Sequence, residues 1–325
     1  MTDQLSQWVE RHQIWCYLFG LALGAGIGLS VPVVAPVAES AIMPLLAVLL
    51  YATFLGLPLG NITAAFKDWK FMSAVLILNF VLVPIVVWFV SRIVAHDHVV
   101  LVGVFCVLLT PCIDYVIVFA GLARGNAQSL LVAAPVLMVL QLMLLPAYFW
   151  LFLGHGFIAS MDLRPFIEVF VWIIVIPLVF AAITQLLARR WQRAKVIDTV
   201  NTALMVPLMT ATLGVVVAAH IANVSHQLGD LLLTVVVYVL FASIMFVLGL
   251  WVGRAARLDV PKQRALVFSG VTRNSLVILP LVLALPAKYS LAPLVVVTQT
   301  LVELLMMLVL INVVPRMIQD RSGRS

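Results

Sequence analysis

Long runs of apolar residues recur along almost the whole chain, and they limit its possible folds more than any other feature. Of the 325 residues, 64% are hydrophobic and 10% are charged, whereas a soluble domain averages about 25% charged residues. A run of about 18 apolar residues is long enough for a helix to cross the hydrocarbon core of a bilayer. The sequence therefore predicts an all-α polytopic membrane protein. No polar stretch is long enough for a soluble catalytic domain, so we do not expect an enzyme.

Ten such runs are predicted to be transmembrane helices, joined by short connections. They are Ile14–Val33, Glu39–Leu57, Phe71–Val94, Val99–Leu122, Gln128–Leu153, Phe166–Leu187, Val200–His220, Asp230–Val252, Ala265–Leu285 and Leu291–Val314. Ten spans divide into two sets of five, and an odd repeat length inverts the second copy in the membrane. We expect a first five-helix repeat over 14–154 and a second, inverted repeat over 155–316, between an N-terminus at 1–13 and a tail at 317–325.

The basic residues set the expected orientation. If the N-terminus is cytoplasmic, 15 of the 19 lysines and arginines fall in inside segments and 3 in outside loops, with Arg273 left inside a span. This asymmetry is the positive-inside signal. It predicts a multi-pass protein of the cell (inner) membrane with both termini in the cytoplasm. The net charge of +6 is explained by these short loops and does not indicate a nucleic-acid partner. The bilayer is the expected environment, and the sequence gives no oligomeric state.

One span is interrupted by polar residues and a proline. The stretch LLTPCIDYVIVFAGLARGN, from Leu108 to Asn126, places Pro111, Cys112 and Asp114 within four residues. Proline removes a backbone donor and clashes with the preceding turn, and freed backbone groups at membrane depth need protein or a water-filled cavity around them. The helix is therefore predicted to break between Thr110 and Asp114.

A second stretch repeats this design. Phe268 to Pro286, FSGVTRNSLVILPLVLALP, contains the polar run Thr272, Arg273, Asn274 and Ser275 inside another span. Two interrupted segments in corresponding halves indicate the substrate site of a secondary transporter. The candidate substrate or ion ligands are Thr110, Cys112, Asp114, Thr272, Arg273, Asn274, Ser275, Glu303, Gln299, Asn79 and Gln141.

The charged candidates allow both functional and structural interpretations. Asp114 could bind a coupling proton or a cation, or it could be a partner of Arg273 or a cap on the second half-helix. Arg273 could attract an anionic substrate together with its polar neighbours, could form an internal ion pair with Asp114 or Glu303, or could reach the cytoplasmic interface. Glu303 could be a coupling-ion site or gate, with Gln299 on the same helical face, or polar glue between helices.

The neutral candidates are equally open. Asn79 and Gln141 are midspan amides that could be ligands or interhelical bonds. Gln141 follows Thr110 by 31 residues, as Glu303 follows Thr272, which agrees with two repeats. Cys112 could be a soft ligand or a small packing residue. The three cysteines form no CxxC pair and no zinc spacing, and there is no phosphate-binding GxxxxGK[ST] loop. We therefore expect no cofactor and transport driven by a gradient of H+ or Na+.

The two interrupted stretches resemble a known family. TPCIDYVIVF followed by LARGN, and GVTRNSLVILPLVLALP with VVVTQTLVEL, resemble the fourth, ninth and tenth helices of Acr3-type arsenite exporters in the bile acid:sodium symporter superfamily. The resemblance implies a core domain of spans 3–5 and 8–10, a panel of spans 1, 2, 6 and 7, and crossed, unwound helices 4 and 9. It also implies that Cys112 contacts a metalloid. This chain lacks the family's carboxylate after Asn274, whose role Asp114 or Glu303 would take.

These observations lead to three functional hypotheses. The first is a secondary active transporter that exports arsenite or a related metalloid by proton antiport through alternating access. The alternative is a sodium-coupled symporter of a small organic anion. A membrane receptor or scaffold without transport is the third, although no signalling domain is present in the sequence to support it.

Overall fold

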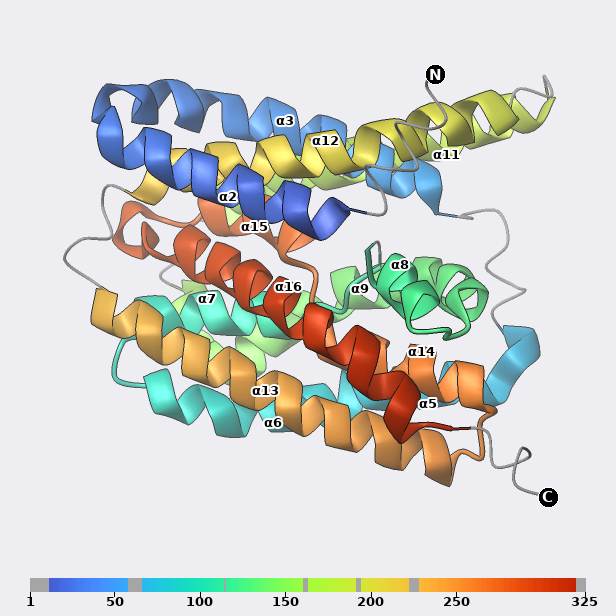
Figure 1. The fold of residues 1–325 in the computed structure, drawn as a ribbon. Coiled ribbons are helices and arrows are strands. Elements are labelled where there is room, and N and C mark those ends of the chain that lie inside the picture. Colours follow the sequence, from blue (N-terminus) through green and yellow to red (C-terminus); the bar gives the residue numbers. More distant parts are fainter. Residues whose placement is uncertain are drawn as a thin grey trace. The chain divides into compact units, whose positions relative to one another are not determined.

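A computed structural model describes residues 12–57, 66–113, 115–159, 163–190, 194–221 and 228–319. All regular secondary structure in these ranges is helical, apart from one isolated antiparallel bridge between Pro111 and Arg273. The prediction of an all-α chain is therefore confirmed for the described residues (Figure 1). Many large apolar side chains lie on the outside, including Trp15 and Phe19, which are 64% and 65% exposed. Such a surface suits a lipid environment.

The chain folds into two compact units. The first comprises residues 1–57, 161–229 and 276–297, and the second comprises 58–160, 230–275 and 298–325. The first unit contains the expected panel spans 1, 2, 6 and 7, and the second contains spans 3–5, span 8 and the first half of span 9. The division differs from the expected core in one respect, because residues 276–297 group with the first unit. The two-repeat boundaries at 14–154 and 155–316 stay a prediction.

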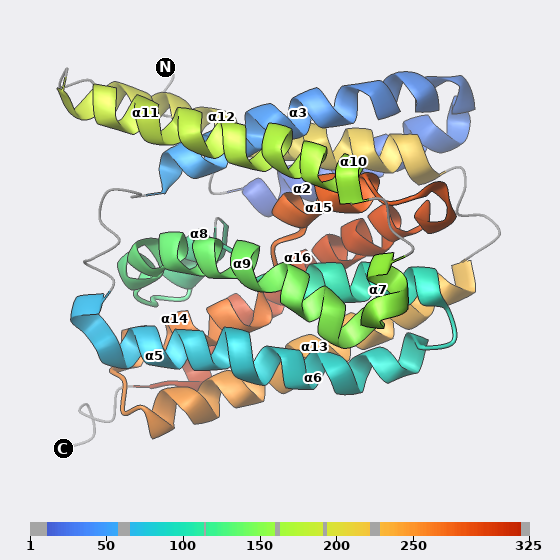
Figure 2. The same ribbon diagram turned by 180° about the vertical axis from the view of Figure 1, so that it is seen from behind.

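The described residues of the first unit are helical, and Figures 1 and 2 show how its helices run beside one another. It contains α2 (Gln13–Ser30), η1 (Pro32–Val34), α3 (Ala35–Gly56), α10 (Leu163–Val169), the π-helix η6 (Phe170–Val175), α11 (Ile176–Arg190) and α12 (Ala194–His220). Helix α12 packs along α2 and α3. Glycines allow the closest approach: a Cβ on Gly24 would lie 2.1 Å from the carbonyl oxygen of Gly214. Helix α11 contacts the C-terminal end of α3. Gln185 Nε2 in α11 donates there to the carbonyls of Phe54 and Leu55.

The second unit carries the first broken span and the start of the second. Its elements are η3 (Phe66–Asp68), α5 (Trp69–Ile77), the π-helix η4 (Leu78–Leu82), α6 (Val83–Val90), η5 (Ser91–Val94), α7 (His98–Leu108), α8 (Tyr115–Leu122), α9 (Ala127–Ala159), α13 (Leu228–Ala255) and α14 (Val260–Val271). Helix α15 (Ser275–Leu283) and η8 (Ala287–Tyr289) follow and lie almost wholly in the first unit, and α16 (Ala292–Met317) begins in the first unit and continues in the second. Helix α14 packs against α5, α8 and α9, so the first half of the ninth span lies among the third, fourth and fifth.

Each of the ten predicted spans contains helical residues in the described part of the chain. In the described part of the chain, six helices are long and apolar enough to cross a membrane: Ala35–Gly56, Trp69–Val94, Ala127–Gly154, Ile167–Ala188, Leu231–Ala255 and Ala287–Met317. The first and seventh predicted spans are shorter apolar helices, Trp15–Ser30 and Leu204–Ala219. The second begins four residues earlier than predicted, at Ala35, because proline in its first turn already has the helical φ angle. The fourth and ninth are interrupted, as predicted.

Candidate functional site

The first break is built by Pro111. Helix α7 ends at Leu108, and the residues from Thr110 to Ile113 are buried but not helical. Pro111 has no N–H to donate to the carbonyl of Val107. Thr110 takes over this role, since its hydroxyl oxygen lies 2.9 Å from the Val107 oxygen and its N–H donates to the same carbonyl at 3.3 Å. The break predicted from the proline is therefore confirmed, with Thr110 satisfying the carbonyl that the proline leaves open.

The second break has no proline. Helix α14 ends at Val271, and Thr272 is extended, with a φ of −84° and a ψ of 142°. The Thr272 hydroxyl donates to the carbonyl of Phe268 at 2.8 Å, as Thr110 does at the first break. Helix α15 starts again at Ser275. Threonine thus ends the first half-helix at both interruptions.

The two breaks pair with each other. Asn274 N–H donates to the carbonyl of Thr110 at 2.8 Å, and Cys112 N–H donates to the carbonyl of Thr272 at 3.4 Å. These bonds flank the antiparallel bridge between Pro111 and Arg273. The pairing gives unwound backbone groups the partners that they need away from water. The predicted contact between the two interrupted segments is therefore present among the described residues, and we call this paired region the crossing.

Arg273 lies at the ends of the two first half-helices. Its side chain is fully buried, with 0% of its surface exposed. Nη2 lies 2.9 Å from the carbonyl oxygen of Ser269 and 2.8 Å from that of Gly270, and Nη1 lies 3.4 Å from that of Leu108. Helix C-termini carry partial negative charge. The guanidinium therefore complements the C-terminal ends of both α7 and α14.

Asn79 holds the guanidinium from a third element. Its Oδ1 accepts from Arg273 Nη2 at 2.8 Å, and its Nδ2 donates to the Ser269 hydroxyl at 3.0 Å. Asn79 lies in the π-helical turn η4, where the extra residue per turn alters the direction of side chains. The midspan amide singled out in the sequence is thus part of the same network as the second break.

Glu303 lies at the start of the two second half-helices. Its side chain in α16 is 3% exposed. Oε1 accepts from the Tyr115 hydroxyl at 2.7 Å, and Oε2 accepts from the backbone N–H of Arg273 at 2.7 Å. Gln299, one turn earlier, also donates to Oε2. Tyr115 begins α8, and Arg273 lies two residues before α15 begins. The carboxylate therefore faces helix N-termini, which carry partial positive charge.

Of the structural alternatives for Arg273, a side-chain ion pair with Glu303 is not present among the described residues. Glu303 binds the backbone N–H of Arg273, while the guanidinium contacts carbonyl oxygens and Asn79. The physical reason is that each charge complements a different set of helix ends. Sequence reasoning also missed Tyr115, although an aromatic hydroxyl directly after a broken segment was a signal that could have identified it.

The remaining candidates are placed as follows. Cys112 and Asn274 are each 1% exposed and lie in the paired segments, and the Ser275 hydroxyl accepts from Thr300 at 2.7 Å. Gln141 is buried in α9, and neither of its amide atoms has a hydrogen-bond partner among the described residues. Among the described residues, no hydrogen bond joins Gln141 to the two paired segments. Asp114 lies outside the described residues.

Comparison with known protein families places the chain in one of them. The family model for the SBF-like CPA transporter family covers residues 17–317, which includes both breaks and Glu303. No curated protein matches the chain significantly.

Proposed function

Because the chain belongs to the SBF-like CPA transporter family, we propose that it is a secondary active transporter in which Glu303 binds the coupling ion. One observation carries this proposal. The buried Glu303 carboxylate contacts both interrupted helices, through the Tyr115 hydroxyl at the start of α8 and the Arg273 N–H in the second break. A change in its charge therefore acts directly on the crossing.

The proposed coupling ion is a proton. The ionised carboxylate accepts three hydrogen bonds, from Tyr115, Arg273 and Gln299. Two of these groups can only donate, but a phenol can also accept. The Tyr115 oxygen lies 3.1 Å from the carbonyl of Arg273. When Glu303 is protonated it can donate to Tyr115, whose own proton then turns to that carbonyl. Protonation therefore rearranges hydrogen bonds without leaving a buried donor unpaired.

We propose that transport follows alternating access in the cell (inner) membrane, with both termini cytoplasmic. Movement of a panel against a core around a fixed midplane site would expose the crossing to each side in turn. The division of the chain into two compact units supports this mechanism. The inverted repeat is part of the same proposal.

The proposed substrate is arsenite or a related metalloid hydroxide, exported in exchange for protons. Cys112 supports it, because the thiol lies in the first unwound segment, directly after the residue that forms the bridge to Arg273. Thiolates are soft ligands and suit a soft metalloid. Replacing this sulfur by a hydroxyl changes the ligand and keeps the size of the side chain.

The coupling proposal is tested in proteoliposomes with an outward or inward pH gradient. Glu303→Gln should abolish gradient-driven flux while substrate exchange without a gradient persists. Asp114→Asn tests the second candidate carboxylate in the same assay. Glu168→Gln is a matched control, because Glu168 is an exposed carboxylate paired with Arg164 on the surface. Wild-type coupling in Glu303→Gln would reject the assignment.

The substrate proposal is tested by arsenite accumulation in cells that lack their own efflux pumps. Wild-type protein should lower accumulation, and Cys112→Ser should not, at equal membrane expression. Cys106→Ser is the control, since Cys106 is a buried thiol in α7 outside the unwound segment. If neither the wild type nor the variants change accumulation, metalloid export is rejected.

A sodium-coupled symporter of a small organic anion is the second candidate, and Gln299 favours it. Its Oε1 is buried without a hydrogen-bond partner among the described residues, and the same side chain contacts Glu303. Amide and carboxylate oxygens suit a hard cation. Sodium-dependent uptake into proteoliposomes, unaffected by Cys112→Ser and lost in Gln299→Leu, would favour this function over metalloid export.

A further inference from the structure

A pocket of about 570 Å³ lies where two membrane spans of the second unit end. One wall is the last turn of α13, whose apolar stretch runs over Leu231–Ala255, and the other is the end of α16, whose apolar stretch runs to Met317. Between these two walls, the pocket is lined by the connection Leu258–Pro261 and by the first turn of α14. The end of a span marks the level of the lipid headgroups.

The wall at α13 is shaped by a left-handed residue. Arg257 has a φ of 52°, in the left-handed region that is unfavourable for a residue with a side chain. It ends the helix with two bonds, from Arg257 N–H to the carbonyl of Arg254 at 3.0 Å and from Leu258 N–H to that of Gly253 at 3.1 Å. The chain therefore turns back sharply, which places Leu258 and the following residues beside the last turn of α13.

The wall at α16 is held by the partly buried side chain of Arg264. Arg264 in α14 donates from Nη2 to the carbonyl of Ile318 at 2.8 Å and from Nη1 to that of Arg124 at 3.2 Å. One guanidinium thus caps the C-terminal end of α16 and the turn after α8. Both walls of the pocket are fixed by the protein itself, so the pocket is a formed site.

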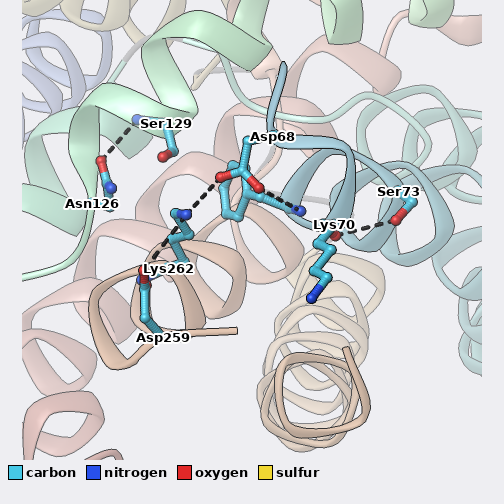
Figure 3. Close-up of polar contacts among 8 residues, drawn as sticks. Asp68, Lys70, Ser73, Asn126, Ser129, Asp259 and Lys262 are labelled. Carbon is cyan, nitrogen blue, oxygen red and sulfur yellow. Dashed lines mark hydrogen bonds and ion pairs between the residues drawn. The ribbon is translucent and has the colours of Figure 1, made fainter. Parts of the chain in front are cut away.

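The acidic residue of the pocket, Asp259, already has hydrogen-bond and ion-pair partners within the protein. Asp259 Oδ1 accepts from the backbone N–H of Lys262 at 2.9 Å, and its Oδ2 lies 3.5 Å from Lys262 Nζ. The same ammonium lies 2.7 Å from Asp68 Oδ2, so that it bridges the N-terminal caps of α14 and α5 (Figure 3). This arrangement leaves Arg254 as the charge in the pocket wall that is not balanced by a neighbouring group.

The side chain of Arg254 makes no hydrogen bond or ion pair with any part of the chain that the structure describes, and the same is true of the side chains of Arg257, three residues later, and Arg316, near the end of α16. The opposite side of the pocket is apolar, with Met317 53% exposed beside the buried Ile318. An unpaired guanidinium next to exposed apolar surface at a span end suits a ligand that is anionic at one end and apolar at the other.

We propose that this pocket binds the headgroup of an anionic phospholipid, with Arg254 on the phosphate and Met317 against the glycerol backbone and first acyl carbons. A zwitterionic lipid carries the same phosphate, but its added positive charge opposes the arginines. A free phosphate ester has the anion without the apolar part, so it would leave Met317 exposed. The proposal is independent of the substrate and coupling ion proposed above.

The test uses the full chain purified in a neutral detergent and native mass spectrometry to count retained lipids during titration with phosphatidylglycerol or phosphatidylcholine. We expect one phosphatidylglycerol site that phosphatidylcholine does not fill. A basic residue near a membrane surface adds about 1 kcal/mol of attraction, so Arg254→Gln should weaken the binding of phosphatidylglycerol about fivefold. Arg254→Lys should keep most of the preference. Arg92→Gln is the matched control, because Arg92 is an exposed arginine at the end of the apolar stretch Trp69–Val94.

Three outcomes would overturn the proposal. Equal binding of both lipids would remove the anionic preference. Unchanged phosphatidylglycerol binding in Arg254→Gln would place the lipid elsewhere. Competition by glycerol 3-phosphate at the same concentration as the lipid would identify a site for free phosphate esters. If Arg254→Gln is not recovered as folded protein, Arg254→Lys together with Met317→Ser, which should weaken binding without changing charge, decides the question.

Discussion

Replacing Arg273 with methionine should destabilise the second unit strongly. Three carbonyls at the ends of α7 and α14, those of Leu108, Ser269 and Gly270, accept from its guanidinium. None has its usual helical donor four residues later, because the N–H groups of Cys112, Arg273 and Asn274 bind elsewhere. The guanidinium is therefore the donor that substitutes for three missing helical bonds.

The size of the effect follows from these acceptors. A buried acceptor left without a partner costs about 1–3 kcal/mol. Arg273→Met would leave the three carbonyls and Asn79 Oδ1 without that donor. Because each carbonyl can relax and the losses are not additive, we take the low end and expect a loss of about 4 kcal/mol. That is a large fraction of the total stability of a protein, about 5–15 kcal/mol. Arg273→Lys keeps the charge but not the planar fork and should lose about half as much.

The assay is reversible unfolding in mixed micelles with a denaturing detergent, followed by tryptophan fluorescence. Arg92→Met is the control, because Arg92 is exposed and stacks on Trp88 with its guanidinium carbon 3.7 Å from the ring centroid. It should change stability little. If Arg273→Met is as stable as Arg92→Met and yet transports nothing, Arg273 acts on the substrate, and the argument from helix ends is refuted.

Three other perturbations give smaller or more local effects. Tyr115→Phe removes the hydroxyl that binds the site carboxylate, and coupled transport should fall about tenfold at unchanged expression; a wild-type rate would show that this hydroxyl has no part in coupling. Gly24→Val should prevent recovery of monodisperse protein on size-exclusion chromatography, since its Cβ meets backbone at 2.1 Å, while Gly26→Val, with nothing within 4 Å, should not. The hydrogen bond to Asp68 raises the pKa of Lys262, so the wild type should exceed Lys262→Met in stability by up to about 1 kcal/mol at neutral pH. The difference in stability between the two proteins should disappear as the pH rises through the raised pKa of Lys262. If unfolding is measured at several pH values and the difference stays constant, the ion pair is contradicted.

The helical architecture could be predicted because the hydrophobic signal is strong. Apolar runs gave the place of each span to within a few residues, and Pro111 gave the first break, since both depend only on local chemistry. The second break was harder to predict because Thr272 and Asn274 do not end helices by themselves. It forms because Arg273, Asn79 and the first break supply partners from distant parts of the chain.

The roles of the two buried charges could not be predicted from the sequence. The sequence left an ion pair between Arg273 and Glu303 open as one alternative, and the directions of the half-helices explain why these two side chains have different partners. Tyr115 was missed for a related reason, because its role depends on the position of Glu303, 188 residues later. Spacing along a chain gives residues on one helical face, but it does not give contacts between segments of opposite direction.

The separation of the two charges bears on where coupling can occur. Arg273 has acceptors at the C-terminal ends of α7 and α14, and these carbonyls keep their partial charge in every protonation state. Glu303 has donors at the N-terminal ends of α8 and α15, and its own charge can be cancelled by a proton or balanced by a cation. Neutralising Glu303 weakens the attraction to both second half-helices at once, whereas Arg273 keeps the first halves together. Under the proposed mechanism, a coupling ion at Glu303 would therefore change one side of the crossing and leave the other intact.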